Sequence, residues 1–543
     1  MADNRLYYGD NLDVLRRYVP DGSVDLVYLD PPFNSNATYN VLFAEQDGKQ
    51  SSAQLQAFED SWRWDESAVT IFQATVKKGG PVSDALRAFY TLLGDSNMMA
   101  YLAMMAPRLV ELHRVLTPTG SLYLHCDSTA SHYLKLLLDA IFDPRRFLNE
   151  ITWKRTTAHN DPNRYGRVQD RILFYSKGPT KTFNRLGGTF SPEQMARYKY
   201  TAADGRRYRA ENLTAPHYSP TRTVEWRGQH PGRDRQWRYG LVELDELWAN
   251  GRILTTRDGR PRKDGLIEYL DEAKAVGPAL QDLWTDIALG PTSAERLGYP
   301  TQKPVALLER IIGTSTNLGD VVLDPFCGCG TAIDAAQKLG RHWIGIDVTH
   351  LAITLIKKRL LDTYGDEITA SYTVIGEPTT EQDANMLALQ DRYQFQWWAL
   401  GLVGARLAEV KKGSDKGIDG RLFFYDDQSA AKQVILSVKS GKVTADDVRV
   451  LRSVVEREHA AIGALLTLEP PTRDMRTEAV GAGHYWSEGW QTEHPRLQIV
   501  TIAELLAGKK LDYPFTGQRG ATFRPAPRAK VAGGRQGALP LGG

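Results

Sequence analysis

Cysteine is scarce in this chain, with three residues among 543. So few thiols exclude a disulfide framework and favour a reducing cytoplasm as the compartment. A secretory leader and a long apolar run are also missing, so we expect neither export nor a membrane segment. The formal net charge is only +2, and a chain of this length exceeds one ordinary core, which predicts two or three domains.

The small net charge conceals a strongly basic segment. Residues 151–240 carry 18 Lys and Arg against 7 Asp and Glu, a local charge of +11 that leaves −9 for the remainder. Its densest arginine cluster is Arg233, Arg235 and Arg238. Its aromatic residues include Trp153, Tyr165, Tyr175, Tyr208, Tyr218, Trp226, Trp237 and Tyr239. Cations interleaved with aromatics predict a surface for phosphates and unstacked bases; the alternative is an irregular domain with a solvated basic face.

The tetrapeptide Asp30-Pro31-Pro32-Phe33 follows the apolar run 24–29, which predicts a strand. The two prolines fix φ and remove backbone donors, so carbonyls are left to point into a pocket, and Phe33 offers a face for an extruded base. An exocyclic amine is a poor nucleophile until acceptors such as Asp30 and the Pro31 carbonyl localise its lone pair. The tetrapeptide therefore predicts methylation of a base amino group, against the alternative of an ordinary strand and proline turn.

A second signal lies near residue 324. The expected elements are a buried strand over 321–323, a glycine-bearing turn over 324–331 and a helix over 332–339. Gly328 and Gly330 let a ligand approach the backbone closely, and the helix N-terminus supplies unpaired donors. The next strand, 342–346, ends in Asp347, where a carboxylate can accept from both ribose hydroxyls of a nucleoside. The pattern predicts nucleoside binding by a Rossmann-like sheet.

A nicotinamide dehydrogenase and a metal site are the competing interpretations of this turn. The turn lacks the third glycine of the dinucleotide fingerprint and carries Asp324 and Phe326 where a pyrophosphate needs bare backbone. Cys327 and Cys329 are two sulfurs without nearby partner ligands, which do not make a four-ligand zinc site. We therefore interpret both cysteines as small turn residues.

The order of the motifs resembles the DNA amino-methyltransferases of the beta class, in which the catalytic DPPF block precedes the target-recognition region and the cofactor block comes last. The matching blocks, which lie between Tyr7 and Leu360, are Gly9-Asp10, the catalytic tetrapeptide, Trp153-Lys154-Arg155, residues 170–177, residues 299–304 and the turn at residue 324. The resemblance implies an α/β fold, with a Rossmann-like methyltransferase that binds S-adenosylmethionine and contains an inserted target-recognition region.

The same resemblance assigns residue roles. It places Asp30, Pro31, Pro32 and Phe33 at the catalytic site and Asp10, Thr301, Gln302, Lys303, Asp324, Phe326, Gly328, Gly330 and Asp347 around S-adenosylmethionine. Within this set, Asp347 would hold the ribose, Asp10 the adenine, and Lys303 with its two neighbours the methionine end. Two alternatives stay open: Asp10 as the cap of a helix over 12–18, and Lys303 as a solvated charge at a helix start.

The resemblance also implies the substrate. A target amine paired inside double-stranded DNA cannot meet the cofactor methyl in line, so the base must be extruded, with Phe33 as its platform. Asp rather than Ser at position 30 resembles the adenine-N6 members of the family more than the cytosine-N4 members, which stay the alternative. Sequence readout would come from arginines of the basic segment, and lysines would position phosphates.

The chain changes character after Leu360. A helix-like stretch over 393–410, a GIDG turn that contains Asp419 and strands over 421–425 and 433–440 resemble an Mrr-like restriction endonuclease of the PD-(D/E)xK type. In that family an Asp, a second acidic ligand and a lysine surround Mg²⁺. Asp419 and Lys439 match, but Ser437 replaces the acidic ligand, and Glu409 is a conjectural substitute. Cleavage, a silent site and a DNA-anchoring module are the three open readings.

The expected organisation follows from these motifs. The segments are a catalytic part over 1–177, a target-recognition insertion over 178–285, a cofactor-binding part over 286–374, a linker over 375–392, a restriction-endonuclease-like domain over 393–513 and a flexible basic tail over 514–543. We expect a cytoplasmic DNA methyltransferase, alone or combined with a Mg²⁺-dependent nuclease, and the sequence leaves homodimer formation open.

Overall fold

The computed structural model places most of the chain. It describes residues 4–32, 38–40, 56–59, 63–156, 162–163, 165–290, 292–299, 301–408, 417–426, 431–514, 522–523 and 525–529, with only the backbone for 38–40 and 56–59. Two predicted site residues, Phe33 and Glu409, lie outside these ranges. The chain divides into two compact units, residues 184–281 and the remainder. Among the described helices, none has the length and apolarity needed to cross a membrane.

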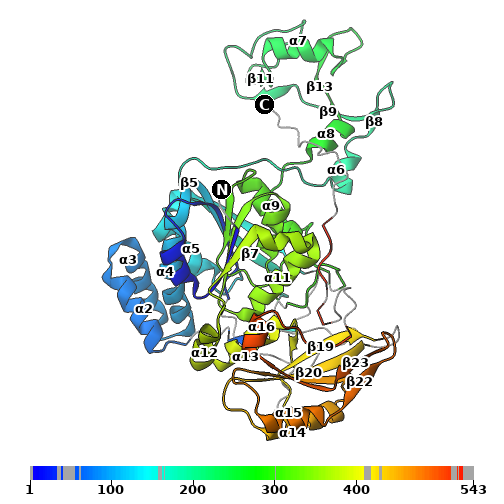
Figure 1. The fold of residues 1–543 in the computed structure, drawn as a ribbon. Coiled ribbons are helices and arrows are strands. Elements are labelled where there is room, and N and C mark those ends of the chain that lie inside the picture. Colours follow the sequence, from blue (N-terminus) through cyan, green and yellow to red (C-terminus); the bar gives the residue numbers. More distant parts are fainter. Residues whose placement is uncertain are drawn as a thin grey trace. The chain divides into compact units, whose positions relative to one another are not determined.

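A nine-stranded sheet organises the larger unit (Figure 1). In spatial order its strands are β14 (Leu283–Trp284), β6 (Phe147–Lys154), β7 (Gln169–Ser176), β5 (Leu116–Cys126), β2 (Val24–Leu29), β15 (Val321–Asp324), β16 (His342–Asp347), β1 (Asn4–Tyr8) and β17 (Tyr372–Ile375). The pairs formed by β7 with β5 and β6 are antiparallel, and the others in this sheet are parallel. A separate two-stranded ladder joins β3 (Thr38–Asn40) to β4 (Gln56–Glu59).

Helices cover both faces of this sheet, which explains why its central strands are almost continuously apolar. One hydrophobic cluster includes side chains of α1 (Asn11–Tyr18), α3 (Gly80–Leu93), α4 (Asn97–Val115) and α5 (Ser131–Phe142), and α2 (Glu66–Lys77) packs against it. The other cluster includes side chains of α9 (Val305–Ser315), α10 (Thr331–Lys338) and α11 (His350–Tyr364). Short 3₁₀ turns occupy Pro144–Arg146 and Asp366–Ser371.

Three neighbouring parallel strands bring the predicted acidic residues together. β15 lies between β2 and β16, so the carboxyl ends of all three strands meet at one edge of the sheet. Asp30 directly follows β2, whereas Asp324 and Asp347 end β15 and β16. A crevice at the carboxyl ends of parallel strands is the usual ligand site of open α/β sheets.

Residues 184–281 form the smaller unit. Its elements are α6 (Pro192–Ala196), β8 (Tyr200–Thr201), β9 (Arg207–Glu211), β10 (Thr214–Pro216), β11 (Arg235–Trp237), α7 (Leu241–Ala249), β12 (Ile253–Thr255), β13 (Pro261–Tyr269) and α8 (Leu270–Val276). Four strands make a sheet in the order β12-β13-β9-β8, and β10 pairs with β11. A small hydrophobic cluster includes Trp226, Trp237 and Leu244.

The aromatic residues of the basic segment do not form one exposed surface, which corrects the sequence prediction. Trp153, Tyr175, Trp226 and Trp237 are buried, because these large side chains supply the cores of the sheet and of the small unit. Tyr165 and Tyr218 are exposed. Tyr208 and Tyr239 are half-buried, so Tyr165 and Tyr218 are the members of the set whose rings are most accessible for stacking on a base.

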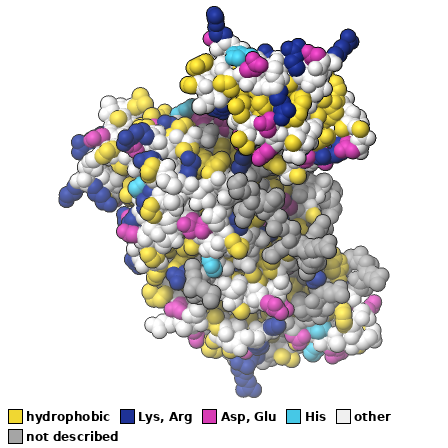
Figure 2. Space-filling view, turned by 90° about the horizontal axis from the view of Figure 1, so that it is seen from above, with side chains coloured by type: hydrophobic (Ala, Val, Ile, Leu, Met, Phe, Trp, Pro, Cys, Tyr) yellow, Lys and Arg dark blue, Asp and Glu magenta, His cyan; other side chains and the backbone are white. Residues whose placement is uncertain are grey.

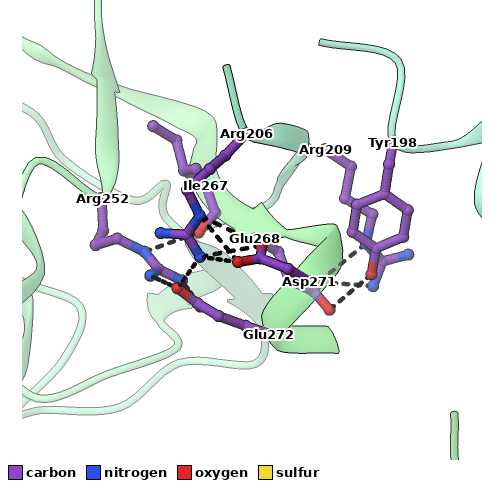
Figure 3. Close-up of polar contacts among 8 residues, drawn as sticks. All are labelled: Tyr198, Arg206, Arg209, Arg252, Ile267, Glu268, Asp271 and Glu272. Atoms are coloured by element: carbon purple, nitrogen blue, oxygen red, sulfur yellow. Dashed lines mark hydrogen bonds and ion pairs between the residues drawn. The ribbon is translucent and has the colours of Figure 1, made fainter. Parts of the chain in front are cut away.

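Several arginines of the small unit are engaged with carboxylates. Figure 3 shows the guanidinium groups of Arg206 and Arg252 converging on Glu272, with Arg206 also bonded to Asp271. Arg209 is bonded to Glu268 nearby. On the face drawn in Figure 2, basic side chains are interspersed with acidic and hydrophobic ones. Part of the basic charge of this segment is therefore neutralised by ion pairs that stabilise the fold of the small unit.

A second sheet forms the C-terminal region, with its strands in the order β18-β19-β20-β21-β24. The elements are α12 (Glu381–Gln390), α13 (Arg392–Leu402), β18 (Arg406–Leu407), β19 (Gly420–Tyr425), β20 (Ala431–Lys439), α14 (Ala445–Arg457), β21 (Ile462–Thr467), α15 (Arg473–Val480), β22 (His484–Ser487), β23 (Thr492–Pro495), β24 (Leu497–Thr501) and α16 (Ile502–Leu506). Helices α14 and α15 pack on one side of the sheet, and α12, α13 and α16 share the other hydrophobic cluster.

The described part of the C-terminal region differs from the sequence predictions at three places. The predicted linker contains helix α12, whose Ala384 and Leu387 are buried in the same core as Trp398. The predicted helix over 393–410 ends at Leu402, because the chain turns at Gly404 with a φ of +66° and enters β18. The described part of the predicted tail packs back: the Ala526 and Ala529 amides donate to α11.

Candidate active site

A cavity of about 450 Å³ lies at the carboxyl edge of β2, β15 and β16. Of the residues predicted from the sequence, Asp10, Asp30, Pro31, Pro32, Thr301, Gln302, Lys303, Asp324, Phe326, Gly328 and Asp347 line it. Gly330 lies in the same turn but does not line the cavity, and Phe33 is outside the described residues. The structure therefore gathers motifs that are almost 300 positions apart in the sequence.

Asp30 is held by one oxygen only. The Lys303 ammonium donates to its Oδ2, whereas Oδ1 is buried without a hydrogen-bond partner among the described residues. The alternative of Lys303 as a solvated charge is wrong, because its side chain is buried and forms an ion pair with Asp30. A buried acceptor without a donor is costly unless a ligand supplies one, so this oxygen is suited to bind a donor from the cavity.

Asp324 and Asp347 add negative potential to the cavity. Burial, together with the nearby Asp30 and Asp347 carboxylates, raises the pKa of Asp324 well above its usual value. Burial also raises the pKa of Asp347, although that carboxylate accepts from the Gly328 amide at 2.9 Å and from the Thr349 amide at 2.9 Å. A ligand with a positive charge would stabilise the ionised form of both groups.

The two glycines of the turn have different structural roles. Gly328 lines the cavity with a φ of +49°, and a Cβ there would approach the Tyr299 ring to 3.2 Å. Gly330 has a φ of +75° at the start of α10, and its Cβ would lie 2.7 Å from a carbon of Ile356. Gly328 thus shapes the cavity wall, while Gly330 permits α10 to pack against α11.

Asp10 caps a helix and also faces the cavity. Its Oδ1 accepts from the Leu12 amide at 2.8 Å, which confirms the capping alternative, and its Oδ2 accepts from Arg108 at 2.5 Å. Arg108 also donates to Asn11 at 2.6 Å and lines the cavity. Sequence reasoning missed Arg108, although an arginine inside the apolar helix α4 was a signal that could have found it.

The segment before α9 closes another side of the cavity. The Gln302 amide bridges its own loop, because it accepts from Leu297 at 2.8 Å and donates to the Glu295 carbonyl at 2.7 Å. Thr301 is half-buried at the wall. Tyr299, which belongs to a matched sequence block but was not assigned a role, also lines the cavity, and burial raises its pKa well above the usual value.

The residues of the predicted nuclease site are arranged differently. Asp419 accepts from Gln396 at 2.9 Å, from Ser437 at 3.1 Å and from the Val438 amide at 2.6 Å. Lys439 lies 3.7 Å from an oxygen of Asp447. Across the described part of the chain, no group of three or more His, Cys, Asp or Glu side chains is placed to hold a metal ion. The described geometry gives no support to the predicted Mg²⁺ ligation.

Comparison with known families decides which family this chain belongs to. Residues 24–358 match the N6/N4 family described as DNA methylase, which is more than half of the chain. The chain belongs to the N6/N4 DNA methylase family. This confirms the predicted DNA methyltransferase and its fold class, and it leaves the choice between adenine and cytosine as a prediction. Residues 392–507 match a second family, described as NACHT-associated inactive restriction endonuclease 1.

Relatives of this DNA methylase include a type II methyltransferase and a subunit of a type III restriction-modification enzyme. The type II methyltransferase M.EcaI of Enterobacter cloacae is 30% identical over 361 residues, which are 66% of this chain and 69% of the relative. The type III StyLTI Mod subunit of Salmonella typhimurium is 26% identical and covers 63% of this chain and 51% of the relative. A solved putative DNA modification methylase of Thermus thermophilus, in complex with S-adenosyl-L-methionine, aligns with 69% of this chain and all of its own, at 17% identity and a TM-score of 0.34.

Proposed function

We propose that the cavity holds S-adenosylmethionine beside an extruded DNA base, and that Asp30 directs methylation of the exocyclic amine of that base. The buried Oδ1 of Asp30, with no donor among the described residues while Lys303 holds Oδ2, is the observation that carries the proposal. An amine that donates to this oxygen and to the Pro31 carbonyl has its lone pair localised toward the methyl group. Phe33 provides the stacking platform for the base.

The donor set of the cavity fits a cationic cofactor. Among the described residues, four carboxylates and two cations line it: Asp10, Asp30, Asp324 and Asp347, with Arg108 and Lys303. Both cations are already paired, Arg108 with Asp10 and Lys303 with Asp30. The two remaining carboxylates have raised pKa values, so a positive ligand would stabilise their charged forms. S-adenosylmethionine brings an ammonium group and a methyl group already activated by a positive sulfur.

Specific roles follow from position along the cavity. Asp347 is proposed to accept from the ribose hydroxyls mainly through Oδ2, which is bonded to the Gly328 amide, because Oδ1 already accepts from both the amide and the hydroxyl of Thr349. Asp10 is proposed to face the adenine of the cofactor. Thr301 and Lys303 are proposed to close over its methionine end, whereas the amide of Gln302 supports the loop that carries them.

The target base is proposed to be adenine, methylated at N6, because Asp occupies position 30. Long-read sequencing of host DNA with and without the gene would report the modified base and its context together. A strain that carries Asp30→Ala is the matched control, since it retains the protein without the acceptor. Methylation at cytosine-N4 would contradict the adenine assignment, and an unchanged methylation pattern would contradict the proposed activity.

Residues 184–281 are proposed to recognise double-stranded DNA. The ion pairs of Arg206, Arg209 and Arg252 stabilise the fold of this unit, so their charges are largely neutralised. Arg233 and Arg257, in contrast, are exposed and have no polar partner among the described residues. Exposed arginines with unused donors are the candidates for contacts to phosphates or base edges.

The C-terminal region is proposed to lack nuclease activity. Both carboxylate oxygens of Asp419 accept hydrogen bonds, from the side chains of Gln396 and Ser437 and from the Val438 amide. A metal ion would have to displace these contacts to bind there. The match of this region to an inactive endonuclease family supports the same conclusion. Incubation of the protein with Mg²⁺ and both methylated and unmethylated DNA tests it, and Mg²⁺-dependent cutting would contradict it.

A further inference from the structure

Three buried side chains form a hydrogen-bonded chain that begins at the cavity. Tyr28 on β2 lines the cavity, and its hydroxyl lies 3.0 Å from Nδ1 of His125 on β5. Nε2 of His125 lies 3.1 Å from Oδ2 of Asp170 on β7. Tyr28 is 2% exposed, His125 is 0% exposed and Asp170 is 4% exposed. The chain therefore crosses three adjacent strands through the protein interior.

The charge of Asp170 sets the direction of these hydrogen bonds. Burial alone would raise the pKa of Asp170, but the hydrogen bond and electrostatic contact with His125, together with the positive charges of Lys303 and Arg155, lower it. An ionised Asp170 accepts from Nε2–H of His125, which leaves Nδ1 as the acceptor for the Tyr28 hydroxyl. Tyr28 thus donates away from the cavity, and its oxygen retains lone pairs.

Tyr28 lies close to the catalytic carboxylate. It precedes Asp30 by two positions, so the two residues lie on the same face at the end of β2, and both line the cavity. The Asp30 and Asp170 carboxylates are near enough to Tyr28 that, after burial, they contribute to raising its pKa well above the usual value. Tyr28 is consequently a neutral hydroxyl that can relay a proton only by receiving one as it releases another.

Methylation of an amine creates a proton that has to leave the cavity. The nitrogen lone pair forms a bond to the methyl carbon as the sulfur–carbon bond breaks with its electron pair moving to sulfur. Positive charge develops on the amine nitrogen as this bond forms, and loss of an N–H proton in the same step relieves it. In the proposed function Oδ1 of Asp30 binds the amine, and its Oδ2 is already bound to the Lys303 ammonium, so another group is needed to carry the proton away.

We propose that the chain of Tyr28, His125 and Asp170 removes this proton. The amine proton passes to the Tyr28 oxygen, the hydroxyl proton passes to Nδ1 of His125, and the resulting imidazolium is stabilised by the Asp170 carboxylate. The amine nitrogen becomes neutral and Tyr28 is unchanged. After the product leaves, the imidazolium returns the proton through Tyr28 to water in the cavity. The inference rests on the proposed methylation chemistry and applies to an adenine or a cytosine amine.

Tyr28→Phe removes the relay atom and keeps the ring, so it is the primary test. A matched control is Tyr123→Phe, because Tyr123 is equally buried on β5 and its hydroxyl bonds to Ser315 at 2.8 Å instead of to the relay. Single-turnover methylation of duplex DNA should fall by about 100-fold in Tyr28→Phe and by far less in Tyr123→Phe. Calorimetric affinity for S-adenosylmethionine should be unchanged in both variants.

Solvent deuterium distinguishes proton transfer from a packing role. Wild-type single-turnover methylation should slow in D₂O, and this isotope effect should disappear in Tyr28→Phe. Asp170→Asn provides a second variant: its amide donates to Nε2 of His125 and turns Nδ1 into a donor, so it should also slow transfer without weakening cofactor binding. Asp170 is the member of the hydrogen-bonded series that lies farthest from the cavity. A slower methyl transfer in Asp170→Asn would therefore have to act through His125.

Each contrary result has a separate meaning. If Tyr28→Phe methylated DNA as fast as Tyr123→Phe, the relay would be overturned. A solvent isotope effect that persisted in Tyr28→Phe would overturn it as well. If Tyr28→Phe lost cofactor binding, Asp170→Asn would decide, and a normal rate in that variant would overturn the relay. Absence of methylation by the wild-type protein on DNA of all contexts would instead contradict the proposed function itself.

Discussion

Asp30 and Asp419 are two carboxylates beside β-strands, yet their surroundings differ in how many carboxylate oxygens remain free to accept a hydrogen bond from a ligand. Asp30 has one oxygen held by Lys303 and one buried oxygen without a partner among the described residues, at the wall of a cavity of about 450 Å³. Both oxygens of Asp419 accept hydrogen bonds from protein groups. Asp30 thus presents an unsatisfied acceptor at the cavity wall, which the proposed chemistry uses, whereas the oxygens of Asp419 are engaged within the protein.

The lysine that accompanies each carboxylate follows the same contrast. Lys303 is buried and directed to Asp30, so it fixes the orientation of the carboxylate. Lys439 is about half-exposed and forms its ion pair with Asp447 on α14. The Lys439 ammonium is thus paired with a carboxylate other than Asp419, and such an exposed ion pair is worth little energetically.

The sharpest test of the comparison replaces each carboxylate. Asp30→Ala should lower single-turnover methylation by at least about 100-fold, because it removes the acceptor that localises the amine lone pair. DNA and cofactor binding should persist in gel-shift and calorimetric assays. Asp419→Ala is the control and should methylate at the wild-type rate. Near-normal turnover in Asp30→Ala would remove that residue from the mechanism.

A second change separates the cofactor contacts from the catalytic contact. Asp347→Ala should weaken S-adenosylmethionine binding by about 10-fold to 100-fold, as expected for lost hydrogen bonds to a charged group. Calorimetry with the cofactor alone measures this effect without the DNA. Asp30→Ala is the control in this assay and should bind near the wild-type affinity. Equal affinity in Asp347→Ala and wild type would exclude the ribose contact.

The raised pKa values of the cavity predict a pH dependence of binding. Asp324 and Asp347 are ionised only above their raised pKa values, and a cationic ligand favours the ionised forms. Affinity for S-adenosylmethionine should therefore fall as the pH is lowered through those values, by up to about tenfold per unit. Asp324→Asn should flatten the profile. Binding that is constant from neutral to acidic pH in the wild type would contradict the prediction.

The basic segment allows a finer comparison between free and engaged arginines. Arg233→Ala should reduce the slope of log affinity against log salt by about one unit if it contacts a phosphate. Arg262, which is exposed but paired with Asp264, is the matched control and should leave the slope almost unchanged as Arg262→Ala. Arg235 should also contribute little, because it already donates to Thr214. Equal slopes in Arg233→Ala and wild type would exclude the phosphate contact.

Short local motifs allowed the sequence to predict most of the residues that line the cavity. Strand-end carboxylates and a glycine turn depend on short-range constraints, so Asp30, Asp324 and Asp347 were located by their immediate neighbours. The contact of Lys303 with Asp30 joins residues 273 positions apart, and Arg108 reaches Asp10 across 98 positions. Such contacts depend on strand order and helix placement, which local patterns do not encode.

The remaining errors also have physical causes. Helix α12 has a polar sequence, because it buries only a few small and apolar side chains such as Ala384 and Leu387, and so its periodicity is weak. Trp226 and Trp237 were expected at a nucleic-acid surface, but a unit of about a hundred residues needs large side chains to build a core. Composition alone does not distinguish a core aromatic residue from a stacking platform.

The smallest expected effect concerns cleavage, where we predict none. Wild-type protein with Mg²⁺ should leave methylated and unmethylated DNA intact, because the oxygens of Asp419 are engaged and Ser437 supplies no charge. Ser437→Glu places a carboxylate two positions before Lys439 and removes the Ser437 hydrogen bond to Asp419, so weak nicking in this variant would show that the site retains the rest of its geometry. Robust wild-type cutting that Asp419→Ala abolishes would reverse the conclusion: the protein would then combine restriction with modification, and the contacts of Asp419 would have to open when metal and DNA bind.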